Sequence, residues 1–440
     1  MLFFFTALLY SMAACFLANC YTLLHGYPQF FPLIAALFLF VNLFAGCFIL
    51  GSRNRKLRIC FHGSVLLTAF CVSVVVSILL QIYLAIVTVP FDLIRIGGSV
   101  ITCVAVNLIL FWNGIACVYL TSTQLGVKNR LVGILCGMIP IVNLFVLFHI
   151  IRTAATEGLF EARKERRNRK RAAQRVCGTK YPILLVHGVF FRDSEYFNYW
   201  GRIPQELETN GARIFYGNQR SAASVADCAA ELKQRIEEVL AETGAEKVNI
   251  IAHSKGGLDS RYAIACLGIG DKVASLTTIN TPHRGCLFAD YLLTKVPLSV
   301  KLGVANTYNA ALRQFGEPNA DFLSAVNDLT VAGCQLLGAQ MPLPTGIYCQ
   351  SVGSVMPRAA SGKFPLNFTY HLANYFSGEN DGLVSESSFR WGENYILLRP
   401  TTKEGISHCD IIDLNKLNIR GFDVREFYVG LVSDLKNRGL

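Results

Sequence analysis

The sequence predicts two parts: an all-α transmembrane region, and then an α/β domain whose mostly parallel sheet has helices on both faces. The first observation is that residues 1–52 carry no charged side chain. The second is the alternation of short apolar runs with amphipathic helical segments from Lys180 onward, which is typical of βαβ units. The third is the segment 248–258, in which an apolar strand runs into Ser254 and a helix begins directly after it.

Charge is distributed unevenly along the 440 residues, whose formal net charge is +11. Residues 1–150 contain one acidic and seven basic residues, whereas residues 151–177 contain three and nine. Residues 178–440 contain 26 acidic and 25 basic residues, so they lack the basic excess that nucleic-acid phosphates would require. We therefore expect no nucleic-acid partner. The changes in composition define three predicted domains: a transmembrane region at 1–151, a polybasic connector at 152–179 and a globular domain at 180–440.

Five apolar runs in the first region are candidate membrane helices: residues 1–24, 30–49, 59–91, 96–127 and 131–151. The first four are long enough to cross a hydrocarbon core of roughly 30 Å, which needs about 20 residues. Pro140 divides the fifth run into pieces of about 9 and 11 residues, so we expect a hairpin that does not cross. Four crossings put both termini and every large basic cluster on the cytoplasmic side. Because no basic residue precedes the first run, we expect an anchor and not a cleavable signal peptide.

The segment Glu161–Arg175 reads EARKERRNRKRAAQR. It has three interpretations: a solvated helical linker, a contact for anionic lipid headgroups, or a nucleic-acid contact. Each basic residue near an anionic bilayer contributes about 1 kcal/mol to binding. The neutral domain that follows makes the first two interpretations the stronger ones.

The globular domain alternates between strands and helices. Strands are expected in the apolar runs at residues 181–186, 212–216, 248–252, 273–279, 346–352 and 395–398. Helices are expected at residues 222–243 and 255–267, and a final helix follows the last strand. Strands joined by helices in this way pair in parallel through right-handed crossovers.

Ser254 is the predicted nucleophile because of the turn on which it lies. A tight strand-to-helix turn lifts the serine out of the sheet, and the residues two positions before and after it must be small. Here they are Ala252 and Gly256, so alanine stands where glycine is usual. A serine hydroxyl is a weak nucleophile at neutral pH and needs a general base.

His408 is the predicted base and Asp381 the predicted acid. His408 follows a late apolar strand and precedes the final helix, and Asp381 lies in the compact turn 379–384. Both come after Ser254, in the order Ser–Asp–His. The other histidines of this domain are less suitable by position: His187, His253, His283 and His371.

The oxyanion of a tetrahedral intermediate needs two backbone N–H donors aimed at one point. One donor is expected from Lys255, which follows the nucleophile. The other is expected from the loop after the first strand, residues 187–190, where Val189 is favoured.

Five segments together resemble the bacterial triacylglycerol lipases of the α/β-hydrolase superfamily: LLVHGVF (184–190), NIIAHSKGGLDSRYA (249–263), NTPHRG (280–285), SGENDGLVSESS (377–388) and SHCDIIDL (407–414). The resemblance implies the α/β-hydrolase fold, with Ser254, Asp381 and His408 as its triad. It also implies a helical lid from Leu287 to about Asp328, where residues 291–308 and 311–326 are amphipathic.

We expect no cofactor and no metal ion. These lipases often hold a structural Ca²⁺ near the triad histidine, and Asp410 matches one of its ligands. The second acidic ligand is missing, because residues 356–366 contain no Asp or Glu. The cysteines of the globular domain are scattered and include no CxxC pair, which argues against a zinc site or a disulfide framework. Such cysteines favour a reducing, cytoplasmic location.

The predicted function is that of a membrane-anchored serine hydrolase that cleaves carboxylic, preferably lipid, esters through an acyl-enzyme. Two alternatives stay open. One is a thioesterase or deacylase of membrane-bound lipid conjugates, and the other is a non-catalytic membrane scaffold that retains the fold. The expected partners are an ester substrate and the bilayer, with anionic headgroups at residues 161–175. The expected location is the cell membrane, with the catalytic domain in the cytoplasm.

Overall fold

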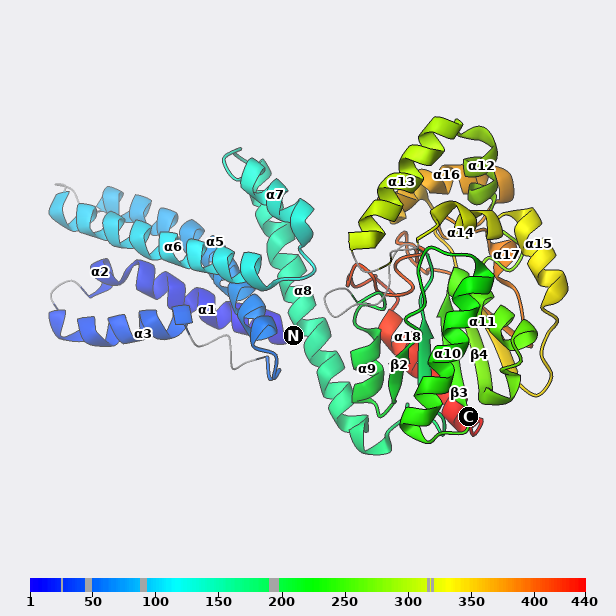
Figure 1. The fold of residues 1–440 in the computed structure, drawn as a ribbon. Coiled ribbons are helices and arrows are strands. Elements are labelled where there is room, and N and C mark those ends of the chain that lie inside the picture. Colours follow the sequence, from blue (N-terminus) through cyan, green and yellow to red (C-terminus); the bar gives the residue numbers. More distant parts are fainter. Residues whose placement is uncertain (25–26, 44–49, 88–92, 190–197, 315–316, 318–319) are drawn as a thin grey trace. The chain divides into compact units, whose positions relative to one another are not determined.

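The computed structural model describes the chain except for residues 25–26, 44–49, 88–92, 190–197, 315–316 and 318–319. Phe190, at the end of the predicted oxyanion loop, lies outside the described residues, as do parts of the second apolar run and of the predicted lid. The chain divides into two compact units, Met1–Lys170 and Arg171–Leu440 (Figure 1).

The second unit is built on a six-stranded, fully parallel sheet in the order β2-β1-β3-β4-β5-β6. The strands are β1 (Ile183–Val186), β2 (Ile214–Tyr216), β3 (Val248–His253), β4 (Val273–Ile279), β5 (Tyr348–Ser354) and β6 (Asn394–Leu398). The chain winds from β1 to β2 in one direction and from β3 onward in the other. In parallel sheets of this kind, ligands bind beyond the carboxyl ends of the strands where the order reverses.

Both faces of the sheet are covered, as the apolar run at β1 predicts. Ile183 and Leu185 point to one face, where they pack with residues of α9 (Ile203–Thr209) and α18 (Val424–Asn437). Leu184 and Val186 point to the other face, against α10 (Val225–Thr243) and α11 (Lys255–Cys266). All four side chains of β1 are fully buried. Because successive side chains of a strand alternate between faces, a continuous apolar run needs a helical layer on each side.

The local sequence explains where the helices begin and end. The hydroxyl of Ser224 caps α10 by accepting a hydrogen bond from the Asp227 N–H at 3.1 Å, and Gly244 ends the helix in the left-handed conformation, with φ 66°. The remaining helical segments of this unit are η2 (Ala172–Gln174), η3 (Gly270–Lys272), α12 (Leu287–Lys295), α13 (Leu298–Gln314), α14 (Phe322–Asp328), α15 (Val331–Gln340), η4 (Ala359–Ser361), α16 (Leu366–Ser377) and α17 (Glu386–Phe389).

The helical insertion between β4 and β5 differs from the predicted lid in two ways. The amphipathic stretch 291–308 is divided between two helices: α12 ends at Lys295 and α13 begins at Leu298, because Pro297 has no N–H to continue the first helix. The insertion is also longer than expected, since α15 extends it to Gln340. The amphipathic stretch 311–326 is likewise divided, because α13 ends at Gln314 and α14 begins at Phe322.

The first unit is helical throughout its described regular structure. Its elements are α1 (Leu2–Ala18), α2 (Cys20–Leu23), η1 (Pro28–Phe30), α3 (Phe31–Leu43), α5 (Arg55–Val87), α6 (Leu93–Thr121), α7 (Gly126–Cys136) and α8 (Val142–Arg171), the last of which ends at the boundary with the second unit. By length and composition, α5 and residues 94–121 of α6 could each cross a membrane. Two shorter apolar helices, α1 and α3, lie beside them in the sequence.

The fifth apolar run and the basic segment do not form separate elements. The run breaks after Cys136, and Ile141 adopts φ 68° before α8 begins. From Val142 a single helix continues to Arg171, so it carries both the last apolar residues and most of the basic segment.

Helices α5 and α6 approach each other closely at Gly63. A Cβ atom at this position would lie 2.6 Å from the Cβ of Cys117 and 2.8 Å from the carbonyl oxygen of Gly114. Small residues at such contacts are typical of helix pairs that associate without a hydrophobic driving force, as they do in lipid.

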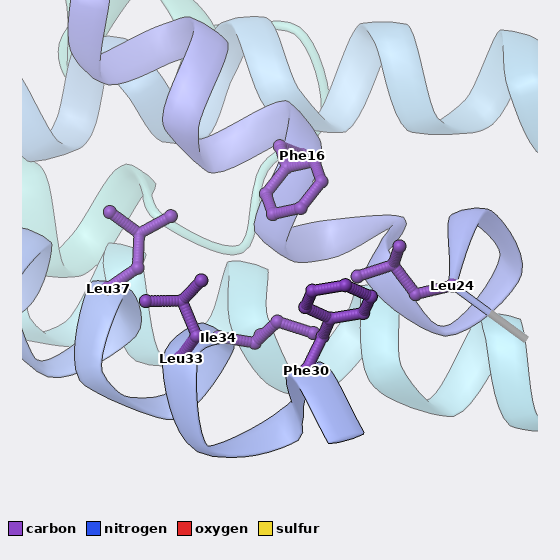
Figure 2. A pocket seen from close by; sticks show the side chains of 6 residues that line it. All are labelled: Phe16, Leu24, Phe30, Leu33, Ile34 and Leu37. Atoms are coloured by element: carbon purple, nitrogen blue, oxygen red, sulfur yellow. The ribbon is translucent and has the colours of Figure 1, made fainter. Parts of the chain in front are cut away.

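An apolar pocket of about 200 Å³ lies among α1, α2 and α3. It is lined by Phe16, Leu24, Phe30, Leu33, Ile34 and Leu37, whose side chains Figure 2 shows around a common space. None of these side chains can donate or accept a proton, so the pocket offers no group for catalysis. Reactive side chains gather instead at the carboxyl edge of the sheet in the second unit.

Candidate active site

Ser254 stands on a strained turn between β3 and α11. Its backbone has φ 55° and ψ −130°, a conformation that non-glycine residues rarely adopt outside functional sites. The turn is held by the Ser254 N–H, which donates to the carbonyl of Ile279 on β4 at 2.9 Å. Gly256 is required here, because a Cβ atom would lie 2.4 Å from the carbonyl oxygen of His187. Ala252 is fully buried, so the methyl group that replaces the usual hydrogen is accommodated.

The structure brings Ser254, His408 and Asp381 into one hydrogen-bonded chain. The Nε2 atom of His408 lies 3.0 Å from the Oγ atom of Ser254. The Nδ1 atom of the same ring lies 2.5 Å from Oδ2 of Asp381. Ser254 and His408 are 7% and 6% exposed and Asp381 is fully buried, so the acid is shielded from solvent while the serine and the imidazole are slightly exposed.

The carboxylate of Asp381 is held on both oxygens. Oδ1 accepts hydrogen bonds from the backbone N–H groups of Leu383 and Val384, at 2.9 and 2.8 Å. Oδ2 accepts from the Nδ2 atom of Asn280 at 2.7 Å, in addition to the imidazole of His408. Four hydrogen bonds therefore engage the two carboxylate oxygens and fix the orientation of the carboxylate. Asp381 therefore stabilises the turn in which it lies and also serves as the partner of His408, and the Asn-Asp-Gly sequence is typical of such a turn.

The predicted oxyanion donors lie on two segments that meet near Ser254: Lys255 follows it directly, and a Cβ atom on Gly188, the residue before Val189, would lie 2.7 Å from the Cβ of Ser254. Lys255 opens α11, where the first N–H groups of a helix have no acceptor within the helix. Val189 follows β1, and its N–H has no acceptor among the described residues. The preceding N–H, that of Gly188, is already engaged with the hydroxyl oxygen of Tyr199 at 3.1 Å.

The side chain of Lys255 points away from this chemistry. Its Nζ atom lies 2.6 Å from Oδ1 of Asp259, and both side chains are buried. Burial alone would lower the pKa of Lys255, but the neighbouring carboxylate outweighs it and the pKa is raised. The lysine is thus a fixed cation beneath the helix and cannot serve as a base.

His253, which precedes the proposed nucleophile, is not part of the Ser–His–Asp chain. His253 is buried, with Nδ1 2.7 Å from the hydroxyl of Tyr199 and its ring centroid 4.5 Å from that of His408. Burial and the neighbouring His408 lower its pKa well below the ordinary value, so it is neutral.

His283 serves a buried arginine. Its Nδ1 atom lies 3.1 Å from NH1 of Arg261 and its Nε2 atom 3.0 Å from Oγ1 of Thr278, while the ring stacks on Trp391. Burial and the two nearby arginines, Arg261 and Arg284, lower the pKa of His283 well below the ordinary value. The imidazole is therefore a neutral partner of a guanidinium and has no contact with Ser254.

Asp410, the possible calcium ligand, is occupied within its own turn. Oδ2 accepts hydrogen bonds from the hydroxyl and the N–H of Ser407, at 2.6 and 3.2 Å. Burial raises the pKa of Asp410, which does not favour a metal-binding carboxylate. Among the described residues, no group of three or more His, Cys, Asp or Glu side chains could hold a metal ion. The residues present do not fit a calcium site.

Three residues of the site were missed by sequence reasoning. Asn280 and Ser354 contact the acid, directly and through each other, and Tyr199 contacts the oxyanion loop. The NTPHRG segment that begins at Asn280 could have pointed to the first. No local pattern marks the other two, since strands β4 and β5 and the segment before α9 meet only in the folded chain.

The sheet order, the strained turn after β3 and the position of the Ser–His–Asp chain define the second unit as an α/β-hydrolase fold. Residues 180–283 match the family described as Lipase (class 2).

Two curated relatives are triacylglycerol lipases. That of Burkholderia plantarii is 34% identical over 203 residues, which cover 41% of this chain and 56% of the relative. That of Pseudarthrobacter phenanthrenivorans is 33% identical over 202 residues, covering 41% and 63%. The chain thus spans less than two thirds of the length of these relatives. The crystal structure of Bacillus licheniformis lipase BlEst2 in mature form is also similar, at 22% identity with a TM-score of 0.43, over 58% of this chain and 92% of that one.

Proposed function

We propose that the second unit hydrolyses carboxylic esters through an acyl-enzyme. The observation that carries this proposal is the unbroken chain from Ser254 Oγ through the His408 ring to Asp381. Ser254 attacks the ester carbonyl while Nε2 of His408 takes its proton, and the N–H groups of Val189 and Lys255 hold the oxyanion. His408 then gives the proton to the leaving alcohol. Water deacylates the serine by the same steps, and Asp381 compensates the charge on the imidazole throughout.

The favoured substrate class is a lipid ester. The relatives that match this unit are described as triacylglycerol lipases. The described part of the unit exposes large apolar side chains within one stretch, 291–376, which includes the insertion α12–α15 and α16. Leu298 on α13 and Phe368 on α16 are 65% and 79% exposed. Apolar surface of this kind beside a site suits an aggregated substrate. The rate should therefore rise when a longer-chain ester exceeds its solubility limit, and a preference for soluble acetate esters would contradict this assignment.

A thioesterase or deacylase acting on lipid conjugates would use the same machinery, since both substrates pass through an acyl-serine. Matched oxygen esters and thioesters of one acyl chain, compared by kcat/KM, separate the two activities. A scaffold without turnover is the less supported alternative, because it has no need of a buried carboxylate aligned on a histidine and a serine.

The direct test is covalent labelling of the full-length protein in membranes with a fluorophosphonate, followed by mapping of the modified residue. We expect the label on Ser254 and no label in the Ser254→Ala variant. Ser433→Ala, a half-buried serine on α18, is the matched control and should label as the wild type does. Labelling at a residue other than Ser254, or none in active membranes, would overturn the assignment.

We propose further that the first unit anchors the protein in a membrane with four crossings, by α1, α3, α5 and α6. Neighbouring contacts support this up-and-down order. The Phe3 and Phe61 rings lie 5.9 Å apart at the starts of α1 and α5, and Asn19 Nδ2 donates to Ser77 Oγ at 2.9 Å further along both helices. His62 Nε2 lies 2.9 Å from the carbonyl oxygen of Asn42, so α3 ends where α5 begins.

Two carboxylates on α8 support a common side for the basic loops. Glu165 accepts a hydrogen bond from the N–H of Arg53 at 3.0 Å, and Glu157 accepts from the N–H of Thr123 at 2.9 Å. The loop before α5 and the loop after α6 therefore lie against the same helix. Basic residues near these loops, Arg53–Arg58 and Lys128–Arg130, then share one side, which the distribution of positive charge makes cytoplasmic.

The exposed cysteine Cys266 tests the side of the second unit. A membrane-impermeant maleimide should leave it unmodified in intact cells and modify it after lysis, with Cys266→Ser as the control. Modification without lysis would place the unit outside.

The basic part of α8 is proposed to contact anionic headgroups. Its exposed basic side chains are Arg163, Arg166, Arg167, Arg169 and Lys170. Binding of the detergent-solubilised protein to phosphatidylserine vesicles should fall between 50 and roughly 500 mM salt, where the Debye length shrinks towards 4 Å. Equal binding to neutral vesicles would favour the solvated linker.

A further inference from the structure

We infer that Asn280 is a positioning residue that joins the proposed acid and the proposed base into one rigid structure. The inference rests on the proposed ester hydrolysis. In this inference, hydrogen bonds from the neutral amide of Asn280 connect the turn that holds Asp381 with the loop that holds His408.

Asn280 is placed for this role by its backbone. It is the first residue after β4 and has φ 46°, a left-handed conformation that asparagine adopts more readily than most residues. Its N–H donates to the carbonyl oxygen of Val352 on β5 at 2.8 Å. The residue is fully buried and turns its side chain towards the carboxyl edge of the sheet.

The amide makes two directed hydrogen bonds. Nδ2 lies 2.7 Å from Oδ2 of Asp381 and 2.8 Å from Oγ of Ser354. Because a carboxylate can only accept, the NH₂ group and not the amide oxygen must face Asp381. The hydroxyl of Ser354 accepts from Asn280 and donates in turn to the carbonyl oxygen of Ile406 at 3.0 Å. The donors and acceptors of these hydrogen bonds are therefore mutually consistent: the Asn280 amide donates twice, and Ser354 accepts once and donates once.

The chain reaches both catalytic elements. Ile406 is two residues before His408, and the N–H of His408 donates to the carbonyl oxygen of Asp381 at 2.9 Å. Asn280 therefore fixes the acid directly and the loop of the base through Ser354. These contacts join the two loops in a region where no group of three or more potential metal ligands lies among the described residues.

Burial of the Asn280 amide carries a desolvation penalty that a purely packing role would not require. Its Oδ1 atom is buried and has no hydrogen-bond partner among the described residues. A buried polar atom without a partner is uncommon in proteins and needs a specific structural or functional reason. An apolar side chain of similar volume would avoid that cost but would lose both N–H donors.

The chemical effect follows from the shared oxygen. Asn280 and His408 both donate to Oδ2 of Asp381, so the amide withdraws part of the negative charge that would otherwise stabilise an imidazolium. Removing the amide leaves the whole of this charge to the imidazolium form of His408. The acidic limb of the pH profile of kcat/KM should then move to higher pH.

Two variants of the full-length protein test the inference. Asn280→Gly keeps the left-handed backbone and removes the amide. Asn280→Asp keeps the size and places a second carboxylate beside Asp381. We expect kcat on a soluble ester to fall about 10- to 100-fold in Asn280→Gly, as for other losses of a hydrogen bond to a charged group or of alignment. We expect the acidic midpoint to rise in both variants, by about one pH unit or more in Asn280→Asp.

The controls separate positioning from stability. Ser354→Ala should lower kcat less than Asn280→Gly and leave the midpoint in place, because the bond to Asp381 remains. Asn249→Ala removes another buried asparagine, at the opposite end of β3, and should lower the thermal unfolding temperature without moving the midpoint.

A wild-type midpoint in both Asn280 variants, with kcat within about 2-fold, would overturn the inference, since a hydrogen bond to a charged group typically gives more. If Asn280→Gly does not fold, the isosteric Asn280→Asp variant decides alone. Absence of hydrolysis and of fluorophosphonate labelling in the wild type would instead refute the proposed function.

Discussion

The two units bury polar side chains in different ways. Between the apolar helices of the first unit the buried partners described are neutral, as Asn19 is with Ser77 and Asn113 with the carbonyl of Asn42 at 2.8 Å. The buried carboxylate of this unit, Glu157, lies on α8 and accepts hydrogen bonds from the loop after α6. In the second unit the buried partners at the sheet edge include a carboxylate and an imidazole. Neutral bonds can fix the order of helices in a medium without water, whereas a buried charge requires several donors fixed in advance.

Three buried histidines have different hydrogen-bond partners, and these partners determine whether each side chain has a structural or a proposed catalytic role. His62 joins two apolar helices through the carbonyl of Asn42, and His283 accepts from a buried guanidinium. His408 alone lies between a carboxylate and a hydroxyl. The comparison predicts that substitutions at the sheet edge change the rate, whereas those elsewhere change stability.

The largest effect is expected from the three residues of the chain itself. Ser254→Ala should abolish ester hydrolysis. Asp381→Asn should lower kcat about 10⁴-fold and His408→Ala about 10⁶-fold, because the proton transfer from Ser254 needs the base and an imidazole held in the correct orientation. Initial rates on a soluble ester, together with thermal unfolding curves near those of the wild type, provide the measurement. Hydrolysis at the wild-type rate in purified Ser254→Ala would refute the assignment.

His283→Ala should give the opposite result. Activity at low temperature should persist, whereas the free energy of unfolding should fall by about 2–3 kcal/mol, because Arg261 loses a hydrogen bond in a buried site. Chemical denaturation of the detergent-solubilised protein measures the change. A crippled enzyme of normal stability would mean that His283 is the base.

Acidic pH should lower the free energy of unfolding of the second unit through two buried histidines, His253 and His283. His253 and His283 have lowered pKa values in the folded state, so below about pH 6.5 the unfolded chain binds protons that the folded chain does not. Stability then falls as the pH falls, by at most about 1.4 kcal/mol per pH unit for each histidine. Denaturation midpoints at pH 7.5 and 5.5 measure the slope, which should be smaller in His283→Ala. An identical slope in that variant would contradict the argument.

In the first unit, Asn113→Leu should loosen the contact between α3 and α6 by about 0.5–2 kcal/mol, the range measured for hydrogen bonds between membrane helices. Faster proteolysis of this unit should accompany an unchanged kcat on a soluble ester. A large loss of kcat would show that the first unit does more than the proposed anchoring.

Calcium removal should have the smallest effect. Because Asp410 is engaged with Ser407 and the residues present do not fit a metal site, EDTA should leave both kcat and the unfolding temperature unchanged. Inactivation by EDTA that calcium reverses would contradict this expectation.

Local patterns were sufficient to predict much of the second unit. The apolar runs located the strands to within a few residues, since a strand buried on both faces must be continuously apolar. The elbow at Ser254 could be recognised because strand, small residues and helix are contiguous in the sequence. The order of Ser254, Asp381 and His408 could be anticipated as well, and the structure places the three side chains within hydrogen-bond distance.

Helix breaks were harder to predict. The interruption at Pro297 follows from a missing N–H, but α8 continues from the apolar run through the basic segment because nothing in its backbone stops it. The composition changes from apolar to basic at residue 151, but the residues on both sides are compatible with a helix. The predicted domain boundary at residue 151 therefore lies inside α8.

The sequence by itself determined the fold class of the second unit, the strained turn at Ser254 and the charge asymmetry of the first unit, because each depends on neighbouring residues. Only the tertiary structure decided that Asn280, Ser354 and Tyr199 belong to the site, and that Asp410 and Lys255 are occupied elsewhere. Hydrogen bonds act over about 3 Å, and the partners of Asn280 are 74 and 101 residues away along the chain. Such contacts exist only once strands β4 and β5 have paired.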